Sequence, residues 1–474
     1  MTPKKKLKQR LKTSIKWMFS IIAVLLCIVL LSIPYGRYSE QEMKPLGTEY
    51  QNIALQGVHV ISMNNDSIMY NKNMYIEQNN IVAITPDTVL REGYSTINAK
   101  GKYVMPGLID MHAHVFDRTD LAQYLAYGVT TVRNMMGFPM HLRWKQKLAE
   151  GKLIGSQLIT ATPTLNSGDD AGPFHKTVSD AEEAGLAVDN YISAGYDFVK
   201  VYDNISATQL DAIEYKAQAK GVQIAGHPPQ VSLERLLSSS IASIEHTEEL
   251  LQFLDEERTE ASIRTLAKEI KASDKAVTLN LAAFNRIYRI SQEGVAYYNH
   301  LQEAALNPIT KFIGTKQLEL YTKAGPQYKA YTEAKYKAME TLSRVLVEEG
   351  VTVLFGTDSG PNFLAAGASV MEELQLLEAA GLSEYEVLKS ATYSAAEVLG
   401  KQELGRIETN ALANVIVLND NPLTGLQTLV QPYMLIANNR YYNETKLAEV
   451  KRVGENKQNT YATLGLFLEH LLFK

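Results

Sequence analysis

Cysteine is almost absent from this chain. Among 474 residues there is one, Cys27, close to the N-terminus. A single cysteine cannot form a disulfide within the chain, and the usual thiolate metal sites need several sulfurs. A transition-metal site beyond residue 27 must therefore use imidazole, carboxylate or a less usual ligand.

A strong net charge is also missing. The formal charge is −5, with 46% hydrophobic and 21% charged residues, which is typical of a globular protein. This mild acidity argues against nucleic acid as the main partner. The sequence has no internal repeat and no low-complexity tract. Its length suits one large catalytic domain and a smaller one.

One long hydrophobic run stands near the N-terminus, from Trp17 to Ile33. Its length is that of the shortest membrane-spanning helices. A basic segment directly before such a run stays in the cytoplasm, which places the rest of the chain on the periplasmic or extracellular side. We therefore predict a transmembrane helix that anchors the protein. Seven basic residues precede the run: Lys4, Lys5, Lys6, Lys8, Arg10, Lys12 and Lys16.

A cleaved signal peptide, giving a secreted protein, is the alternative. No small-x-small cleavage motif follows the run, which favours an uncleaved anchor. Leu26 is too large to precede the cysteine of a lipoprotein signal, and the apolar run continues beyond Cys27.

The remaining chain changes its pattern twice. Short strands with Asn, Asp and Gly between them fill residues 50–104 and return after Gly400. The predicted division is a basic N-terminus, anchor and linker (1–49), the first part of a β-sandwich (50–104), a barrel (105–400), the second part of the sandwich (401–448) and an apolar tail (449–474).

Between residues 105 and 400, apolar strand-like runs alternate with helical stretches. This pattern predicts an α/β protein with a (β/α)8 TIM-like barrel, carrying a small composite β-sandwich built from both chain ends. Arg286–Glu349 is predicted to be a helical insertion. Thr463–Phe473 is predicted to pack on the domain as a helix, with a membrane-surface contact as the alternative. The eight predicted strands are 107–115, 128–135, 156–165, 196–203, 221–227, 242–246, 276–282 and 350–358.

Five residues fall at the C-terminal ends of these strands, where barrel enzymes place their active sites. They are His112, His114, His227, His246 and Asp358. Four imidazoles and one carboxylate around one barrel mouth indicate a zinc-like metal site. A lone histidine at a strand end is more often structural, so the joint pattern carries this prediction.

The other five histidines are predicted not to bind metal, because none of them lies at the end of a barrel strand with its side chain toward the axis. The one at position 175 could still reach substrate. These residues are His59, His141, His175, His300 and His470.

Lys200 lies inside the apolar run Tyr196–Asp203. Side chains two apart on a strand share a face, so Phe198, Lys200 and Tyr202 point toward the barrel axis. Burial lowers the pKa of a lysine, and a neutral amine can add carbon dioxide to form an anionic carbamate. Such a carbamate could bridge two metals. The alternative is a lysine that extends its amine to solvent.

The order of these residues along the chain, His-x-His, Lys, His, His and Asp, resembles that of the amidohydrolase superfamily with a carboxylated lysine. "MPGLIDMHAHV" and "YGVTTVRNM" are similar to its opening, and "GYDFVKVYD", "IAGHPP", "SIEHTEE", "LFGTDSG" and "ATYSAAEVLG" resemble its imidazolonepropionase and prolidase-like branch. The resemblance covers about Ala54–Asn438. "ALANVIVL" and Arg286–Glu349 depart from the pattern.

The resemblance implies a metal-dependent hydrolase with two divalent metals, taken as Zn²⁺. His112, His114 and Asp358 would hold one metal. His227 and His246 would hold the other, and carboxylated Lys200 would bridge them.

The resulting hypothesis is a membrane-anchored amidohydrolase in which a metal-activated water cleaves a C–N bond of a dipeptide, another amide or a cyclic amide. Asp358 would transfer the proton, and Tyr202 would donate to the oxyanion unless it is a packed core tyrosine. A mononuclear deaminase, which does not need Lys200, is one alternative. A lactone or phosphoester hydrolase and a non-catalytic binding protein are the others. The partner is a small molecule or dipeptide, and homo-oligomerisation is left open.

Overall fold

The computed structural model describes residues 3–39, 42–89, 91–301 and 305–474. The side chains before residue 12 lie outside this description, so most of the predicted basic flank is not tested.

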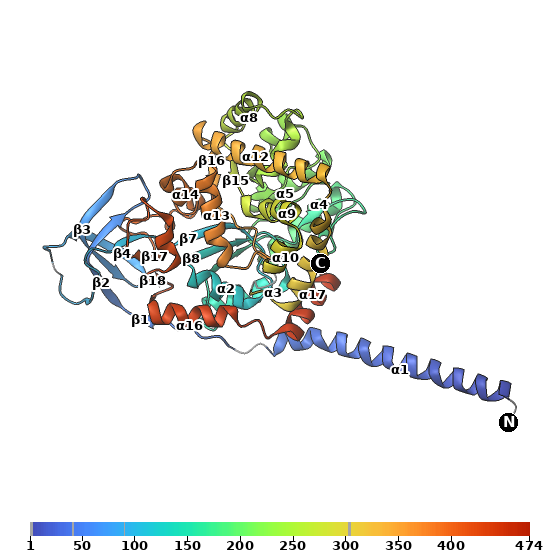
Figure 1. The fold of residues 1–474 in the computed structure, drawn as a ribbon. Helices are drawn as coiled ribbons and strands as arrows, with labels where there is room; N and C mark the ends of the chain where they lie inside the picture. The colour runs from blue at the N-terminus through green and yellow to red at the C-terminus, as the bar shows by residue number, and fades with distance from the viewer. Residues whose placement is uncertain (1–2, 40–41, 90, 302–304) are drawn as a thin grey trace.

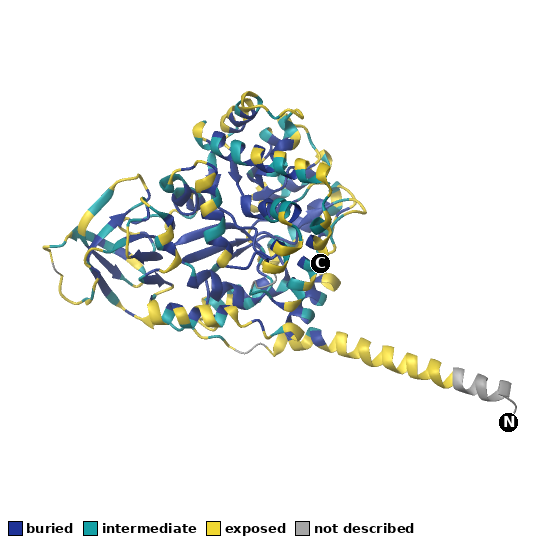
Figure 2. Ribbon diagram, in the orientation of Figure 1, coloured by how far each residue is buried: buried dark blue, intermediate teal, exposed yellow. Residues whose placement is uncertain are grey.

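Helix α1, Pro3–Tyr38, extends away from the rest of the protein as a single rod (Figure 1). From residue 12 onward its side chains are exposed, and they become buried only near its C-terminal end, where it meets the globular part (Figure 2). Within the described chain, α1 is the one helix long and apolar enough to cross a membrane, over Lys12–Tyr38. By length and composition it fits either a membrane anchor or a signal sequence.

One nine-stranded sheet collects strands from both ends of the chain. Strand β17 pairs antiparallel with β6, and this pairing joins the C-terminal strands to the N-terminal ones. The sheet order is β1-β19-β18-β17-β6-β2-β3-β4, and β5 pairs with β2. The strands are β1 (Thr48–Glu49), β2 (Asn52–Ile61), β3 (Ile68–Glu77), β4 (Asn80–Pro86), β5 (Ser95–Asn98), β6 (Tyr103–Pro106), β17 (Val415–Leu418), β18 (Met434–Ala437) and β19 (Arg440–Asn443).

Parallel strands make up the centre of the molecule, and one overlaps each predicted strand range. Strands β7, β8 and β9 form one parallel sheet, and β12 to β16 pair in sequence order in another. Parallel bridges join the two sheets at Ala161–Phe198 and Ala113–Ser359. The strands are β7 (Leu108–Ala113), β8 (Val129–Asn134), β9 (Gln157–Thr160), β12 (Val199–Val201), β13 (Ile224–Gly226), β14 (Ile241–Glu245), β15 (Ala276–Thr278) and β16 (Thr352–Leu354), with short β10 (Leu165–Asn166) and β11 (Lys176–Thr177) beside β12.

Helices follow the parallel strands, which confirms the α/β class. Local signals set their ends: Ser206 caps α5, forming a capping box with Gln209, and Gly221 ends it at φ 65°. The helices are α2 (Arg118–Ala126), α3 (Pro139–Ala149), α4 (Ala181–Ala194), α5 (Ala207–Lys220), α6 (Leu233–Ser238), α7 (Thr247–Leu250), α8 (Glu260–Ala272), α9 (Leu281–Glu293), α10 (Val295–Leu301), α11 (Pro308–Leu318), α12 (Pro326–Glu348), α13 (Ala368–Ala379), α14 (Glu384–Ser390), α15 (Tyr393–Val398), α16 (Glu444–Glu455) and α17 (Thr460–Phe473), with 3₁₀ turns η1 (Leu251–Phe253), η2 (Glu319–Lys323) and η3 (Leu426–Val430).

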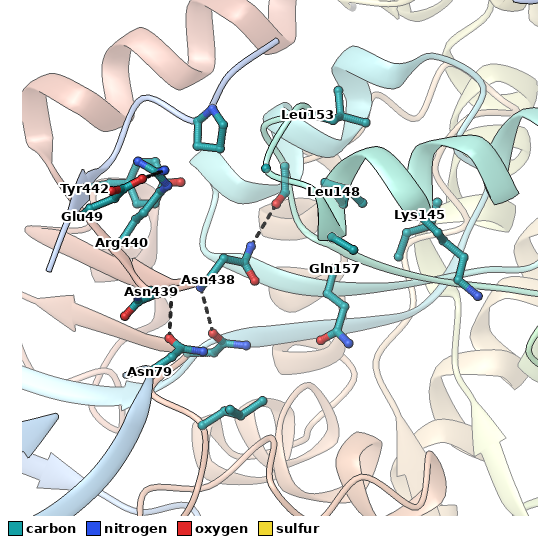
Figure 3. A pocket seen from close by; sticks show the side chains of 17 residues that line it. Glu49, Asn79, Lys145, Leu148, Leu153, Gln157, Asn438, Asn439, Arg440 and Tyr442 are labelled. Carbon is teal, nitrogen blue, oxygen red and sulfur yellow. Dashed lines mark hydrogen bonds and ion pairs between the residues drawn. The ribbon is translucent and has the colours of Figure 1, made fainter. Parts of the chain in front are cut away.

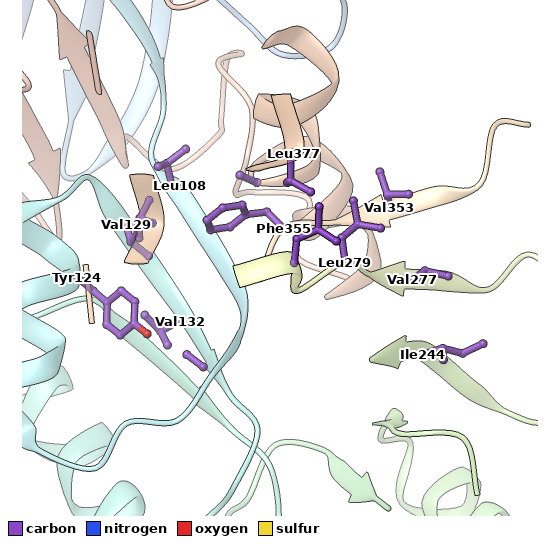
Figure 4. Packing of buried hydrophobic residues seen from close by; sticks show 14 of the residues in the cluster. Leu108, Tyr124, Val129, Val132, Ile244, Val277, Leu279, Val353, Phe355 and Leu377 are labelled. Carbon is purple, nitrogen blue, oxygen red and sulfur yellow. The ribbon is translucent and has the colours of Figure 1, made fainter. Parts of the chain in front are cut away.

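Two faces of strand β12 belong to different apolar clusters. Val199 and Val201 are fully buried in the large cluster that packs strands against helices. Figure 4 shows part of this cluster, with Val353 and Phe355 near Leu377 of α13. Phe198 instead joins a small cluster with side chains from other strands. The predicted alternation therefore holds, and Lys200 shares the face of Phe198.

A polar cavity of about 550 Å³ lies between the nine-stranded sheet and the parallel strands. Figure 3 shows its asparagines bonded to backbone and to one another. The Asn438 side chain donates to the Gly155 carbonyl at 3.3 Å, and the Asn439 backbone donates to Asn79 Oδ1 at 3.0 Å. Gln157, which lines this cavity, begins β9, so the cavity lies at the N-terminal end of that strand. None of the predicted site residues lines it.

Candidate active site

A second cavity, of about 530 Å³, lies at the C-terminal ends of the parallel strands. All the side chains predicted as metal ligands or substrate contacts line it. Residues separated by up to 246 positions in the sequence therefore meet at one place. These side chains are His112, His114, Lys200, Tyr202, His227, His246 and Asp358.

Asp358 faces His112 of strand β7 and His114 just after it. Its Oδ1 lies 2.9 Å from His114 Nε2 and 3.4 Å from His112 Nε2. Burial raises the pKa of Asp358, but the hydrogen bond of His114 and nearby positive charges outweigh this effect, and the net pKa is lowered. Asp358 is therefore an ionised carboxylate positioned between two imidazoles.

The other two histidines continue the same group of rings. The His246 ring centre lies 4.5 Å from that of His112 and 4.7 Å from that of His227. His246 has a positive φ of 70°, and Asp358 one of 50°. Left-handed backbone is unfavourable for a histidine, and strain of this kind clusters at functional sites. Burial holds the pKa of both His227 and His246 well below the usual value, so both rings are neutral.

Lys200 is only 2% exposed, and its Nζ has no hydrogen-bond partner among the described residues. Desolvation lowers the pKa of Lys200 to about 8, although the negative charges of Glu245 and Asp358 oppose this shift. A neutral amine is therefore accessible near neutral pH. The predicted inward direction of Lys200 agrees with its place in the cavity wall.

Tyr202 and His175 extend the cavity on the side of β12. The Tyr202 ring lies 4.0 Å from the His227 ring and 4.6 Å from the His175 ring, measured between centres. Burial raises the pKa of Tyr202 strongly, so its hydroxyl stays protonated and can donate a hydrogen bond. His175, set apart at the sequence level as the histidine that could reach substrate, does line the cavity.

Sequence reasoning missed a buried ion pair behind His112. Glu245 Oε2 lies 2.8 Å from His112 Nδ1, while its Oε1 accepts a 2.7 Å bond from Arg133. Arg133 also donates to the Met111 carbonyl at 2.6 Å and to Ser243 Oγ at 3.0 Å. A carboxylate bonded to the second nitrogen of a metal-ligating histidine fixes its ring orientation and tautomer. The signal was available, because both charged residues interrupt apolar strands.

Asp110 is a second residue that the sequence did not reveal. It connects strand β7 to the segment that follows β16. Its Oδ1 accepts from the backbone of His112 and of Thr357, both at 3.1 Å, and its Oδ2 accepts from Thr357 Oγ1 at 2.6 Å. Burial raises the pKa of Asp110 to about 7. Asp110 thereby holds the backbone that carries His112 next to the backbone that carries Asp358.

Acidic side chains on the opposite wall were also missed. Asp203 Oδ1 lies 2.9 Å from His227 Nδ1, and Glu249 lies 3.9 Å from the same nitrogen. Glu248 lies 3.7 Å from His246 Nδ1, and burial raises the pKa of Glu248 to about 8. Glu248 and Glu249 lie two and three positions after the predicted His246 and line the cavity, whereas Asp203, three positions after Lys200, contacts His227 from outside the lining.

The donor set fits divalent metals. Potential ligand atoms of His112, His246 and Asp358 all lie within 4.8 Å of one another, as do those of Asp203, His227 and Glu249. Neutral imidazoles and carboxylates are the ligands that zinc takes where thiolates are absent. Buried Nδ1 of His246, like Lys200 Nζ, has no hydrogen-bond partner in the described chain. Lys200 and His246 therefore offer unpaired donor atoms in the cavity, whereas Nδ1 of His227 is bonded to Asp203.

The Arg133–Glu245 pair gives a test of stability. Side-chain exposure is 3% for Arg133 and 0% for Glu245, so Arg133→Met leaves a buried charge without its partner. We expect a loss of about 3–5 kcal/mol in the free energy of unfolding, measured by chemical denaturation. Arg235→Met, which removes a partly exposed pair, should cost at most about 1 kcal/mol. Equal losses in the two variants would contradict the assigned role.

Comparison with known proteins gives a consistent result. The model of the Amidohydrolase family matches residues 103–453. Imidazolonepropionase of Treponema denticola is 24% identical over 366 residues, covering 70% of this chain and 81% of that protein. L-hydantoinase of Paenarthrobacter aurescens is 23% identical over 311 residues, covering 61% of this chain and 64% of that protein.

Solved structures resemble the fold. Bottromycin amidohydrolase superposes with a TM-score of 0.71 at 23% identity, covering 86% of this chain and 91% of that one. A Xaa-Pro dipeptidase with bound methionine in its active site superposes with a TM-score of 0.67 at 18% identity, covering 83% of this chain and all of that one. At these identities the likeness shows the fold alone.

Proposed function

Because the chain belongs to the amidohydrolase family, we propose that it hydrolyses the C–N bond of an amide, a dipeptide or a cyclic amide at the cavity that contains Lys200. It is a hydrolase, and its relatives include an imidazolonepropionase and a hydantoinase. The observation that carries the proposal is the convergence of the seven predicted side chains on one cavity at the C-terminal ends of parallel strands. We propose that these strands form a TIM-type (β/α)8 barrel, residues 105–400, with a β-sandwich made of 50–104 and 401–448.

Metal binding is assigned to the predicted ligands. His112, His114 and Asp358 would hold one divalent metal, His227 and His246 a second, and a carbamate on Lys200 would join the two. Bound zinc supplies Lewis acidity and lowers the pKa of a coordinated water to near 7. The unpaired, buried Nζ of Lys200 supports carbamate formation, in which the amine bonds to carbon dioxide and releases one proton.

The chain's own groups then have distinct tasks. Asp358, ionised and next to His114, is placed to accept a proton from the attacking water and to return it to the leaving nitrogen. The Tyr202 hydroxyl, in the same cavity, would donate to the oxygen that gains charge. Glu245 keeps the His112 ring in one orientation through its 2.8 Å contact with Nδ1.

Metal removal tests this proposal. Dialysis against a chelator should abolish hydrolysis of a panel of dipeptides, N-acyl amino acids and small lactams, and added zinc should restore it. Metal analysis of the active protein should find two equivalents per chain. Full turnover in the metal-free protein would contradict the assignment.

A mononuclear deaminase is the second candidate function. It is favoured by the close grouping of His112, His246 and Asp358, which needs neither Lys200 nor His227. One metal equivalent per chain, together with ammonia release from an aminated ring, would support it against the binuclear hydrolase.

We also propose that α1 is retained as a membrane anchor, with the catalytic part on the non-cytoplasmic side. The basic residues before its apolar run support this orientation. The last turns of α1 pack on α17, and Ser32 is fully buried. Cleavage after the apolar run would remove part of this folded interface. The unprocessed N-terminus should therefore be found in the membrane fraction of cells that express the chain.

A further inference from the structure

The last turn of α17 exposes three neighbouring apolar side chains. Leu471 is 39% exposed, Leu472 61% and Phe473 68%. Phe312 of α11, a helix that packs on α17, is 63% exposed. Neighbouring exposed apolar side chains such as Leu471, Leu472 and Phe473 mark an interaction site more often than scattered single residues do. We name Leu471, Leu472, Phe473 and Phe312 the apolar rim.

The helix that carries most of this rim is fastened to the end of α1. The Tyr461 hydroxyl donates to the Ile28 carbonyl at 2.6 Å, inside the apolar run. Added Cβ atoms would meet opposing backbone at Gly36, 2.4 Å from the Ala462 oxygen, and at Gly465, 1.8 Å from the Ser32 oxygen. Close backbone approach at small residues is how membrane helices pack.

The junction of α1 and α17 has the residues of a membrane boundary. Tyr35, Tyr38 and Tyr461 are 50%, 76% and 36% exposed, and tyrosines gather at the level of lipid headgroups. Arg37, at the end of α1, lies 3.7 Å from Glu469. Since Lys474 follows Glu469 by five residues, the end of α17 stands about 8 Å along the helix from this boundary.

The same helix packs against residues that line the cavity. The Phe467 ring lies 5.4 Å from Phe116 and 5.3 Å from Phe174, both of which line the catalytic cavity. His470 Nε2 lies 2.8 Å from the Phe174 carbonyl, and Lys474 bonds to the Pro173 carbonyl. Figure 1 shows the C-terminus and α17 on the side of the domain from which α1 extends. The cavity edge is therefore linked to the end of α1 by one helix.

We propose that the apolar rim inserts into the interface of the bilayer that α1 spans, and that the cavity takes an amphipathic N-acyl amide from that bilayer. The second half of this inference rests on the proposed function. We choose the bilayer as the partner of the apolar rim because α17, which carries most of the rim, packs on the apolar helix α1.

The cavity lining matches such a substrate. Histidines, Lys200 and Asp358 form one part, and Phe116, Phe174, Ile287 and Ile313 form an apolar part. Ile313 follows the exposed Phe312 directly, so the apolar lining is one residue from the rim. An acyl chain on the apolar side would place its amide at the polar side, where the catalytic groups are.

Fluorescence quenching tests the insertion. The full chain has two tryptophans, Trp17 and Trp144, so Trp17→Phe leaves only the buried Trp144 as background. Phe473→Trp is added to this protein in nanodiscs that contain lipids brominated near the headgroup. We expect quenching of the new tryptophan. Tyr215→Trp on α5, where the native residue is 71% exposed, is the matched control and should not be quenched. Equal quenching, or none in either variant, would overturn the proposal.

Activity tests the substrate class. In proteoliposomes, Leu472→Ser with Phe473→Ser should lower kcat/KM for an N-palmitoyl amino acid by about tenfold, since two exposed apolar contacts with lipid are lost. Hydrolysis of the N-acetyl form in solution should change less than about twofold, because neither side chain lines the cavity. Equal loss on both substrates, or none on either, would overturn the bilayer route. If the wild type hydrolyses neither amide, the proposed function and the substrate class fail, while quenching still decides the membrane contact.

Discussion

Lys200→Ala is expected to lower kcat/KM for an amide substrate by about 10³-fold or more. Metal centres supply several kcal/mol of transition-state stabilisation, and each 1.36 kcal/mol is tenfold in rate. Lys200 lies buried in the cavity with an unpaired Nζ, so its loss removes the group assigned to join the two metals. Turnover and bound metal should fall together in the variant.

A rescue experiment separates the carbamate from a merely structural lysine. Short carboxylates such as acetate or propionate should restore part of the activity of Lys200→Ala, because they return an anionic oxygen pair to the space left by the side chain. Lys275→Met is the matched control: Lys275 is also buried, but its Nζ bonds to the Ser239 and Ile241 carbonyls. It should keep its metal and show no carboxylate rescue.

The carbamate can also be observed directly. Wild-type protein incubated with carbon-13 bicarbonate should give a carbamate resonance that is absent in Lys200→Ala. A bare amine at Lys200 in fully active protein would contradict the assignment, and so would unchanged turnover in the alanine variant.

The strand pattern placed the candidate site because two rules act locally. Side chains alternate across a strand, and parallel strands end at the same edge of a barrel. Phe198 and Val199 belong to different apolar clusters, as this alternation requires. His112, His246 and Asp358 then meet because each lies within four residues of the C-terminal end of a strand. No knowledge of their distances along the chain is needed.

The partners of these residues depend on packing that no local pattern contains. Arg133 and Glu245 are 112 positions apart, and only the packing of the parallel strands makes them an ion pair. Lys200 was selected as a charged residue inside an apolar strand, and the same criterion would have selected both Arg133 and Glu245. Glu248 and Glu249 follow the predicted His246, but their approach to the cavity depends on the turn at its left-handed backbone.

The contact between the two ends of the chain could not be predicted from a local pattern either. A helix over the apolar tail was predicted from its composition, and α17 covers that segment. Its contact with α1 was not predicted, because Ile28 and Tyr461 are 433 positions apart. Such pairings follow from where the nine-stranded sheet and the parallel strands place both ends of the chain.

Asp358→Asn is the second substitution expected to have a large effect. Asparagine keeps the size of the side chain but cannot accept and return a proton. General acid–base groups contribute about 10²- to 10⁴-fold, so kcat should fall within that range. Asp358 Oδ1 is 2.9 Å from His114 Nε2, and the lowered pKa of Asp358 keeps it ionised in the native protein. Steady-state kinetics and metal analysis of the same preparations check this expectation.

Asp203→Asn provides the comparison that separates proton transfer from support of a histidine. Asp203 is also a carboxylate within 2.9 Å of a predicted histidine ligand, but it bonds to Nδ1 of His227 and is assigned no proton transfer. Loss of such a supporting partner costs about 10- to 100-fold in metal affinity or activity. Saturating zinc should therefore recover most of the activity of Asp203→Asn and little of that of Asp358→Asn. If zinc restored both variants equally, Asp358 would be a metal ligand only, and the proton acceptor would have to be another group in the cavity.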